Sequence, residues 1–369
     1  MRALAAVAAA TGAMAQSTVT ISGNLNINAI NNTKVTTQTG TNAATFVKTS
    51  NTGLREGWTA SQIGFSGTED LGGGLKASFV INSRLDNNPA AGRAILGGRD
   101  TNVALEGGFG TVRLGRFIPA AASGFHGYTG ARTTNQAGSL YTGLLGGGEA
   151  AFGNADDVGG SFERQDAVVQ YTSPSFNGIT VNVSYGNAGS DNSAQVGDSD
   201  SKQTGLSVTY TAGPLSIAAG MNNRDVNVEN PTAANRTARD ANLDWFGASY
   251  DLGVAKVSIA QIKRDAKTST GGAASVTNTD IKANAIGVTV PMGAFTFAAS
   301  TYSGKNKVGA AATDDLKLSG HQLSVTYALS KRTTIYAAMG ENKTKRDGAN
   351  TAGDAVKSTS NAIGLMHTF

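Results

Sequence analysis

The chain contains no cysteine, and only 6 prolines and 2 tryptophans occur among its 369 residues. The lack of cysteine excludes disulfides, thiol nucleophiles and thiolate metal sites. No stretch approaches the roughly 18 consecutive apolar residues that a membrane-spanning helix requires. The net charge of +4 is small and no basic run alternates with aromatic residues, so nucleic acid is not expected as a partner.

The chain is instead rich in glycine, with 48 residues, and in short segments that alternate between apolar and polar side chains. A soluble chain of this length usually forms two domains with amphipathic helices or aliphatic runs, and neither is found here. A closed membrane β-barrel explains the composition, because its apolar band faces outward and its interior is polar.

Alternation is clearest at the two ends of the chain. The C-terminal segment places Ile363, Leu365, His367 and Phe369 on one face and Gly364, Met366 and Thr368 on the other. Near the N-terminus the apolar face has Val19, Ile21, Leu25 and Ile27, and the polar face has Thr18, Thr20, Ser22, Asn24, Asn26 and Asn28. We expect the polar face to line a water-filled lumen.

Between these ends one unit repeats: a strand, a short turn, a strand and a long polar connection. Short turns are expected at Glu69–Gly74, Gly107–Gly110, Ser173–Gly178, Thr211–Pro214, Asp251–Gly253, Pro291–Ala294 and Leu329–Arg332. Polar connections are expected near Asn31–Arg55, Leu85–Asp100, Phe117–Glu163, Gly186–Lys202, Asn223–Ala241, Lys263–Thr279, Ser303–Lys317 and Glu341–Lys357. The count predicts an all-β transmembrane antiparallel barrel of about sixteen strands, a size that encloses an aqueous channel.

The first residues are typical of an export signal. Arg2 supplies the positive end, 3–10 form a short apolar region, and Ala13-Met14-Ala15 forms a small-x-small cleavage site. Residues 1–15 are therefore predicted to be a signal peptide, with 16–369 as a single barrel domain. Tyrosines at strand ends favour an interfacial girdle: Tyr171, Tyr185, Tyr210, Tyr250 and Tyr327, together with Phe369.

Five collinear segments resemble the trimeric general diffusion porins of Gram-negative outer membranes, of the β-proteobacterial type. They are GFSGTEDLGGGLKA at 64–77, GGFGTVRLGR at 107–116, YTSP at 171–174, YALSKRTTIY at 327–336 and GLMHTF at 364–369. The resemblance implies a homotrimer, exported through the periplasm to the outer membrane, where it meets lipid and lipopolysaccharide. It also implies that one long connection, here about 117–163, folds inward and narrows each pore.

The resemblance further implies that wall arginines face acidic groups on the inward-folded loop. Arg116 and Arg164 match the family's arginines, and Arg113 faces inward by alternation from Leu114. The acidic partners are predicted to be Glu149, Asp156 and Asp157, in the second half of the loop. We assign Arg84, Arg93 and Arg99 to the extracellular rim, outside this constriction.

The chain departs from the family at several lumen positions. Asn24, Gln62, Ser66 and Met366 stand where family members often have basic residues. Because neutral side chains thin the positive wall, the prediction is a weakly anion-selective or near-neutral channel.

Other chemistries have less support. The acid pairs Asp156-Asp157 and Asp198–Asp200 lack the ligands of a calcium loop, and the three histidines have no local triad partners. We expect no enzyme, cofactor or metal, but a passive channel for small hydrophilic solutes and ions. Two alternatives stay open: a substrate-selective porin for an organic anion or a sugar, and a surface-interaction barrel with a plugged lumen.

Overall fold

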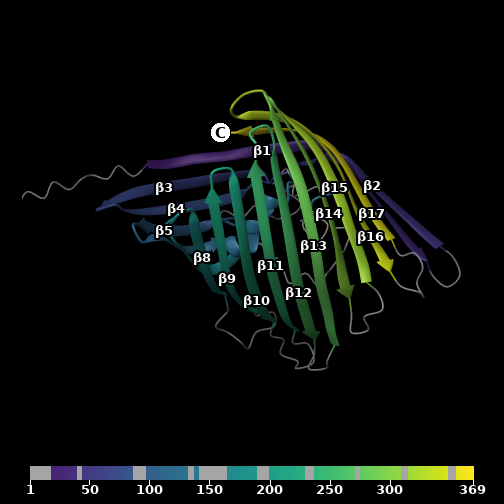
Figure 1. Ribbon diagram of the computed structural model, residues 1–369, viewed down its shortest axis with the longest axis horizontal. Coiled ribbons are helices and arrows are strands. Elements are labelled where there is room, and N and C mark those ends of the chain that lie inside the picture. The colour runs from purple at the N-terminus through teal and green to yellow at the C-terminus, as the bar shows by residue number, and fades with distance from the viewer. Residues whose placement is uncertain are drawn as a thin grey trace, which may run out of the picture.

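The computed structural model describes residues 18–39, 44–85, 97–131, 137–140, 164–188, 199–228, 237–270, 275–308, 315–347 and 355–369. Within these residues seventeen strands form a single sheet, and sequence neighbours other than β2 and β3 pair antiparallel (Figure 1). The sheet closes on itself because β1 pairs with both β17 and β3. The predicted transmembrane β-barrel is confirmed.

The first half of the wall follows a regular up-and-down order. The strands are β1 (Thr18–Thr39), β2 (Ala44–Glu56), β3 (Gln62–Gly72), β4 (Leu75–Arg84), β5 (Thr101–Gly107), β6 (Gly110–Phe117), β7 (Gln165–Thr172) and β8 (Ile179–Ala188). Two short helices, α1 (Ala120–Ser123) and the 3-10 helix η2 (Gly124–Tyr128), follow β6.

The second half consists of longer strands. They are β9 (Ser199–Ala212), β10 (Leu215–Val228), β11 (Thr237–Asp251), β12 (Lys256–Thr270), β13 (Ser275–Met292), β14 (Phe295–Val308), β15 (Asp315–Ala328), β16 (Thr333–Asp347) and β17 (Ala355–Thr368). In the described parts of the chain no helix is long and apolar enough to cross a membrane.

The strand count agrees with the sequence prediction once β2 and β3 are considered together. β2 pairs with the upper part of β1, from Ile27 to Thr39, and β3 pairs with the lower part, from Thr18 to Asn24. The two strands therefore occupy one position in the wall, interrupted by residues 57–61. Seventeen strands thus form a barrel of sixteen positions.

The expected long connections were wrong in extent, although the short turns are where they were predicted. The segments Asn31–Arg55, Asn223–Ala241, Lys263–Thr279, Ser303–Lys317 and Glu341–Lys357 are largely strand. The described strand residues of these segments pair with neighbouring strands above the apolar band. Where every backbone group has a cross-strand partner, a polar segment is as stable in a ladder as in a loop.

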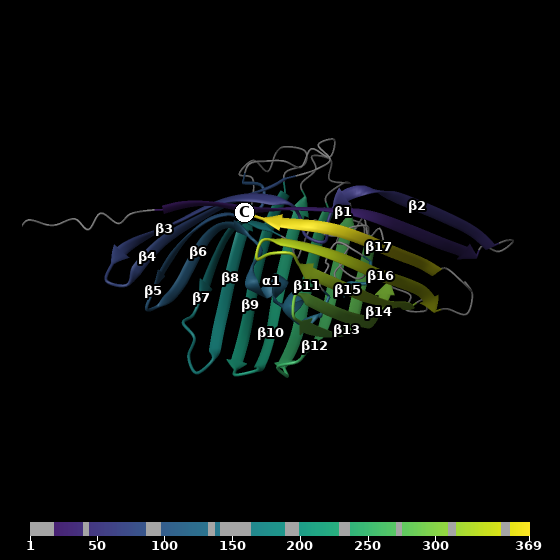
Figure 2. The same ribbon diagram turned by 90° about the horizontal axis from the view of Figure 1, so that it is seen from above.

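The wall is consequently uneven in height. β5, β6 and β7 have 7, 8 and 8 residues, whereas β11 to β16 have 14 to 18. We call the side formed by β4–β8 the low wall and the side formed by β11–β16 the high wall. Viewed from above, the two sides extend in different directions around the lumen (Figure 2).

Side-chain alternation follows the predicted faces. Ile363, Leu365 and Phe369 are 59%, 49% and 40% exposed on the outside, whereas Asn26 and Asn28 are buried on the inside. The inner face is not polar throughout, however. On β11–β15 it bears an apolar cluster that includes Leu243, Trp245, Ile262, Ile281 and Leu318. The prediction of a uniformly polar interior was wrong there, because part of the inward-folded loop packs on this patch.

Candidate permeation pathway

The described part of the long connection after β6 lies inside the barrel. α1 and η2 contact the inner faces of β8 to β12 (Figure 2). The indole nitrogen of Trp245 donates to the carbonyl of Ala121 over 2.7 Å, and the hydroxyls of Tyr128 and Ser216 are 2.9 Å apart. Aromatic packing among Phe125, Tyr128 and Trp245 completes the anchor.

Further along, the same connection reaches the opposite wall. The amide of Ala137 donates to Ser360 over 3.0 Å, and the amide of Gly138 donates to Asn342 over 2.9 Å. Leu140 is buried in the apolar cluster. The connection thus crosses the lumen from the low wall to β16 and β17. This confirms the expected inward-folded loop for the residues that the structure describes.

Close approach of the loop depends on wall glycines. A Cβ added at Gly205, Gly247, Gly287 or Gly340 would collide with Ala121, Tyr128, Gly130 or Ala137 of the loop, respectively. We call these four wall positions the glycine track. At these glycines the loop lies directly against the backbone of β9, β11, β13 and β16. A side chain at any of the four positions would move the loop away from the wall and change the width of the lumen.

Arg113 faces the lumen, as predicted, and is held by neutral groups. Its Nε donates to Asn102 Oδ1 over 2.9 Å, and its guanidinium lies 4.1 Å from the centroid of the Phe117 ring. Phe117 is fully buried. Contact with a ring face and a side-chain amide orients the guanidinium while leaving its charge in place.

Arg164 and Arg116 have carboxylate partners. Arg164 Nε donates to Asp100 Oδ1 over 2.8 Å, and both side chains are mostly buried. Arg116 donates to the carbonyl of Gly98 over 3.2 Å and to Asp166 over 2.5 Å. The structure therefore brings Arg113 and Arg164 together near Asp100, while Arg116 is bound to an exposed acid.

A β-bulge explains the position of Arg116. The register between β6 and β7 shifts between Gly115 and Phe117, and Gly115 has a φ of +133° that other residues rarely adopt. In the pairing with β5, Arg116 shares the parity of the outward-facing Leu114. The predicted acidic partners Glu149, Asp156 and Asp157 lie outside the described residues.

A second inward feature, which the sequence did not reveal, is the break between β2 and β3. We call residues 57–61 the inner shelf. Trp58 stacks on Tyr336 of β16 with ring centroids 4.1 Å apart, and the Tyr336 hydroxyl donates to Asn26 over 2.7 Å. Asn26 also donates to Thr59 over 3.1 Å. The side-chain amide of Asn24 donates to the carbonyl of Ala60 over 3.1 Å, so Asn24 and Asn26 both hold the shelf in addition to lining the interior as predicted.

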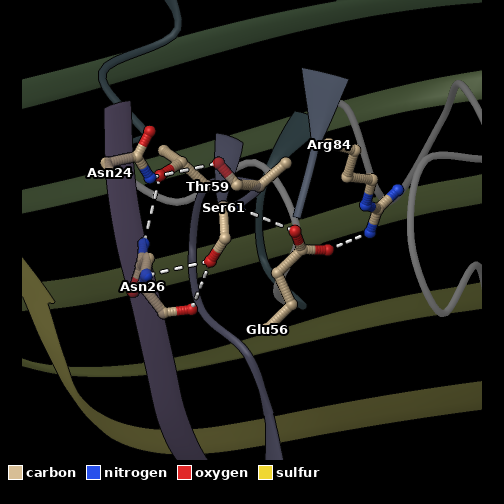
Figure 3. Close-up of polar contacts among 7 residues, drawn as sticks. Asn24, Asn26, Glu56, Thr59, Ser61 and Arg84 are labelled. Carbon is tan, nitrogen blue, oxygen red and sulfur yellow. Dashed lines mark hydrogen bonds and ion pairs between the residues drawn. The ribbon is translucent and has the colours of Figure 1, made fainter. Parts of the chain in front are cut away.

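The shelf continues into an ion pair that faces the lumen (Figure 3). Glu56 accepts the Ser61 amide over 2.7 Å and pairs with Arg84 at the top of β4. Arg84 has the parity of Asn82, opposite to the outward Ile81, so its side chain is directed inward at the upper end of β4. Glu56 ends β2 and Arg84 ends β4, 28 residues apart, so no local pattern in the sequence indicates this pair.

Comparison with known proteins agrees with this architecture. The family model described as Gram-negative porin matches residues 3–347. The chain belongs to the Gram-negative porin family. This porin is 31% identical over 363 residues to outer membrane porin protein 32 of Delftia acidovorans, covering 93% of this chain and 89% of that protein. It is 25% identical over 318 residues to major outer membrane protein P.IB of Neisseria gonorrhoeae, covering 84% of each.

Solved structures show the same fold. The anion-selective porin from Comamonas acidovorans is 26% identical, with a TM-score of 0.64, and the match covers 96% of this porin and all of that chain. OmpT of Vibrio cholerae, described in a trimer form, is 16% identical with a TM-score of 0.62, covering 96% of this porin and 99% of that chain. The protein is therefore a porin of the Gram-negative outer membrane, a diffusion channel with a loop-narrowed lumen.

Proposed function

We propose that this porin passes small hydrophilic solutes and ions by passive diffusion, with a mild preference for anions. The observation that carries the preference is the charge arrangement around Asp100. Arg164 bonds to this carboxylate, and Arg113 interacts with it electrostatically, so two cations share one acid. The low-dielectric walls of a narrow, water-filled lumen strengthen the effect of the uncompensated charge on passing ions. The related Comamonas porin, described as anion-selective, supports the same sign.

The proposed selectivity filter consists of arginines of the barrel wall and acidic residues of the inward-folded loop. Arg113 and Arg164 would face Glu149, Asp156 and Asp157, creating a transverse field across the narrowest part of the pore, whereas Arg116, which has the parity of Leu114, would act only at the edge of this field. Arg116 contributes least, because Asp166 neutralises it at an exposed site. Selectivity therefore depends mainly on Arg113.

The test is the reversal potential of single channels in a potassium chloride gradient. Arg113→Gln is expected to shift the permeability ratio toward potassium, because it removes the charge held by Asn102 and Phe117. Arg332→Gln removes one charge at the turn between β15 and β16, far from the loop, and is the matched control. An unchanged ratio in Arg113→Gln would exclude this residue from the filter.

We further propose that the porin is a homotrimer that contacts its partners through the low wall. A strand exposed to lipid needs about 9–11 residues to cross the hydrocarbon region. β5, β6 and β7, with 7 to 8 residues, fall short of that length. A neighbouring subunit would cover this side, leaving the high wall to meet lipid and lipopolysaccharide. Native mass spectrometry of the detergent-solubilised porin should give three copies, and a monomer would contradict the proposal.

The remaining proposals concern processing and chemistry. Residues 1–15 are proposed to be a signal peptide, so the N-terminal residue of the porin recovered from outer membranes should be Gln16. The channel needs no cofactor, metal or catalytic residue. Block of conductance by a sugar or an organic anion in a saturable manner would instead indicate a substrate-selective porin. Absence of conductance would indicate a plugged surface-interaction barrel.

A further inference from the structure

Two opposite charges lie on the inner face of the low wall, one position apart along the path of a solute. Arg113 of β6 pairs with Ala104 of β5, and Glu106, two residues nearer the short turn Gly107–Gly110, has the same inward parity as Ala104. β5 and β6 lie side by side in the low wall (Figure 2). Diagonal neighbours of this kind on a sheet have Cα atoms roughly 7–8 Å apart. One small solute can therefore reach both the guanidinium and the carboxylate.

The guanidinium of Arg113 is held away from Glu106. Its Nε donates to Asn102 Oδ1 over 2.9 Å, and Asn102 lies on the opposite side of Ala104 from Glu106 along β5. The ring of Phe117, which is 4.1 Å from the guanidinium, belongs to the upper end of β6. Among the described residues the terminal Nη groups have no hydrogen-bond partner, so they can bind a solute.

Glu106 belongs to a row of three exposed charges beside the short turns, which are periplasmic in outer-membrane barrels. Cross-strand pairing places Asp70 of β3 opposite Lys76 of β4, and Lys76 opposite Glu106. We call these three residues the exit row. In the described part of the chain Glu106 forms no ion pair. One lysine between two acids leaves one negative charge of the exit row uncompensated, below the positive charge of Arg113.

The sign of the wall charge thus changes along the path of a solute. A simple anion is attracted at Arg113 and repelled at the exit row, and a simple cation meets the reverse order. A zwitterion, which has both a carboxylate and an ammonium group, is attracted at both places. Two charge-assisted hydrogen bonds of about 2.8 Å each, joined by the carbon between the charged groups of an α-amino acid, span a gap of this size.

We propose that Arg113 and Glu106 form a binding site for zwitterionic amino acids inside the pore, with the carboxylate of the solute on Arg113 and its ammonium group on Glu106. The inference rests on the proposed diffusion function and assigns a substrate class to it. Both charges face water, so each contact is modest. A solute bound in this way is enriched in the pore and still leaves it readily, which is the condition for rapid permeation.

The test compares the entry of alanine and of lactamide into lipid vesicles that contain the porin. The two solutes are isomers, but only alanine has separated charges. The vesicles are placed in an isosmotic solution of either solute at low ionic strength, where charges are least screened, and their swelling rate is recorded by light scattering. We expect alanine to enter through the intact porin about twofold faster than lactamide or more, as exposed charge pairs allow.

Glu106→Gln and Arg113→Gln should each make the two rates equal, because each substitution removes one of the two contacts with the zwitterion. Glu106→Asp retains the carboxylate and should keep most of the preference for alanine. Glu69→Gln removes an acid from the outward face of β3 near the same rim and is the matched control, which should keep all of it. A distorted pore mouth would slow both solutes together, so the ratio of the rates separates binding from a structural effect.

Equal entry of the two isomers through the intact porin, or a preference that persists in Glu106→Gln, would overturn this inference and leave the proposed diffusion function standing. Entry of neither solute would overturn both. Lactamide entry also shows whether a variant has formed an open pore. If Glu106→Gln has not, Lys76→Gln decides the question. Removing the competing cation of the exit row should raise the preference for alanine, and an unchanged or lower preference would overturn the site.

Discussion

The arginines on the inner side of the low wall have different binding partners, some charged and some neutral. The charge of the partner determines how strongly each arginine acts on permeating ions. Arg84 is paired with Glu56, whereas Arg113 is bound to an amide and an aromatic ring. A charge with a neutral partner acts on ions in the lumen, but a paired charge is largely cancelled. Removing an acid should therefore have the opposite effect to removing Arg113.

Glu56→Gln is expected to increase anion preference, because it exposes the charge of Arg84 while its amide oxygen still accepts the Ser61 amide. The shift in reversal potential should be opposite in sign to that of Arg113→Gln. Glu69→Gln, on the outward face of β3, is the control and should leave the ratio unchanged. A shift toward cations in Glu56→Gln would contradict this assignment.

His126 makes the packing of the inward-folded loop dependent on pH. Burial beside the Phe125 ring, 4.1 Å away, lowers the pKa of His126 to about 4, from an ordinary value near 6.5. The docked loop therefore favours the neutral ring. Its docking is strongest above about pH 6.5 and weakens as the pH falls toward 4, because only the undocked histidine gains a proton in that window.

We expect open-channel noise to increase between pH 6.5 and 4 as docking of the loop weakens. His126→Gln should flatten this dependence, since glutamine does not titrate. Noise that rises equally in the variant would assign the effect to other groups.

The glycine track can be tested at one position. Gly247→Ala should displace Tyr128, because the added methyl group would collide with its ring. Overpacking of this kind costs about 1–3 kcal/mol. The expected result is a changed and more variable conductance in a barrel that still folds. Gly127→Ala, where an added Cβ meets nothing within 4 Å, is the control in the same loop.

At the scale of strands, the sequence correctly predicted the short turns, which depend on the residue types of the turn itself. Turns such as Gly107–Gly110 and Leu329–Arg332 have turn-forming residues between alternating segments, and the structure places them there. Strand height was not predictable in the same way. The segment Asn31–Arg55 is as polar as a loop, and its described residues are strand because β1 pairs with both β2 and β17. Where a polar segment becomes a strand only because it pairs with a neighbouring strand, its sequence shows no alternation of apolar and polar residues, and the strand cannot be predicted from it.

The inward side of the high wall was missed for a similar reason. Leu243, Trp245 and Ile262 face inward because α1, η2 and Leu140 arrive from more than a hundred residues away in the sequence to cover them. The one local signal is the pair Trp245-Phe246, in which adjacent bulky residues break the alternation. Alternation predicted the inward face of Arg113, but it could not reveal the bulge at Gly115 or the neutral partners Asn102 and Phe117.

At the scale of the whole molecule, stability in the membrane depends on which face a residue occupies. Val183, 48% exposed on β8, faces outward, and its neighbour Asn182 faces inward. Val183→Arg should reduce the free energy of folding into lipid bilayers by about 2–4 kcal/mol, as expected for a cation in the apolar band. Asn182→Arg should cost less, because the lumen is hydrated.

The measurement is urea-dependent folding into phosphatidylcholine vesicles, followed by tryptophan fluorescence. Equal costs for the two substitutions would contradict the assignment of inner and outer faces.

The glycine track has a consequence for how this channel can change. Glycine has no side chain to remove, so no substitution at Gly205, Gly247, Gly287 or Gly340 can give the loop more room, and any replacement pushes it away from the wall. Substitutions at these four sites can therefore only move the loop into the lumen and narrow the channel. A bacterium exposed to a toxic solute could exclude it by a single replacement here, whereas admitting a bulkier nutrient would require shortening the loop itself.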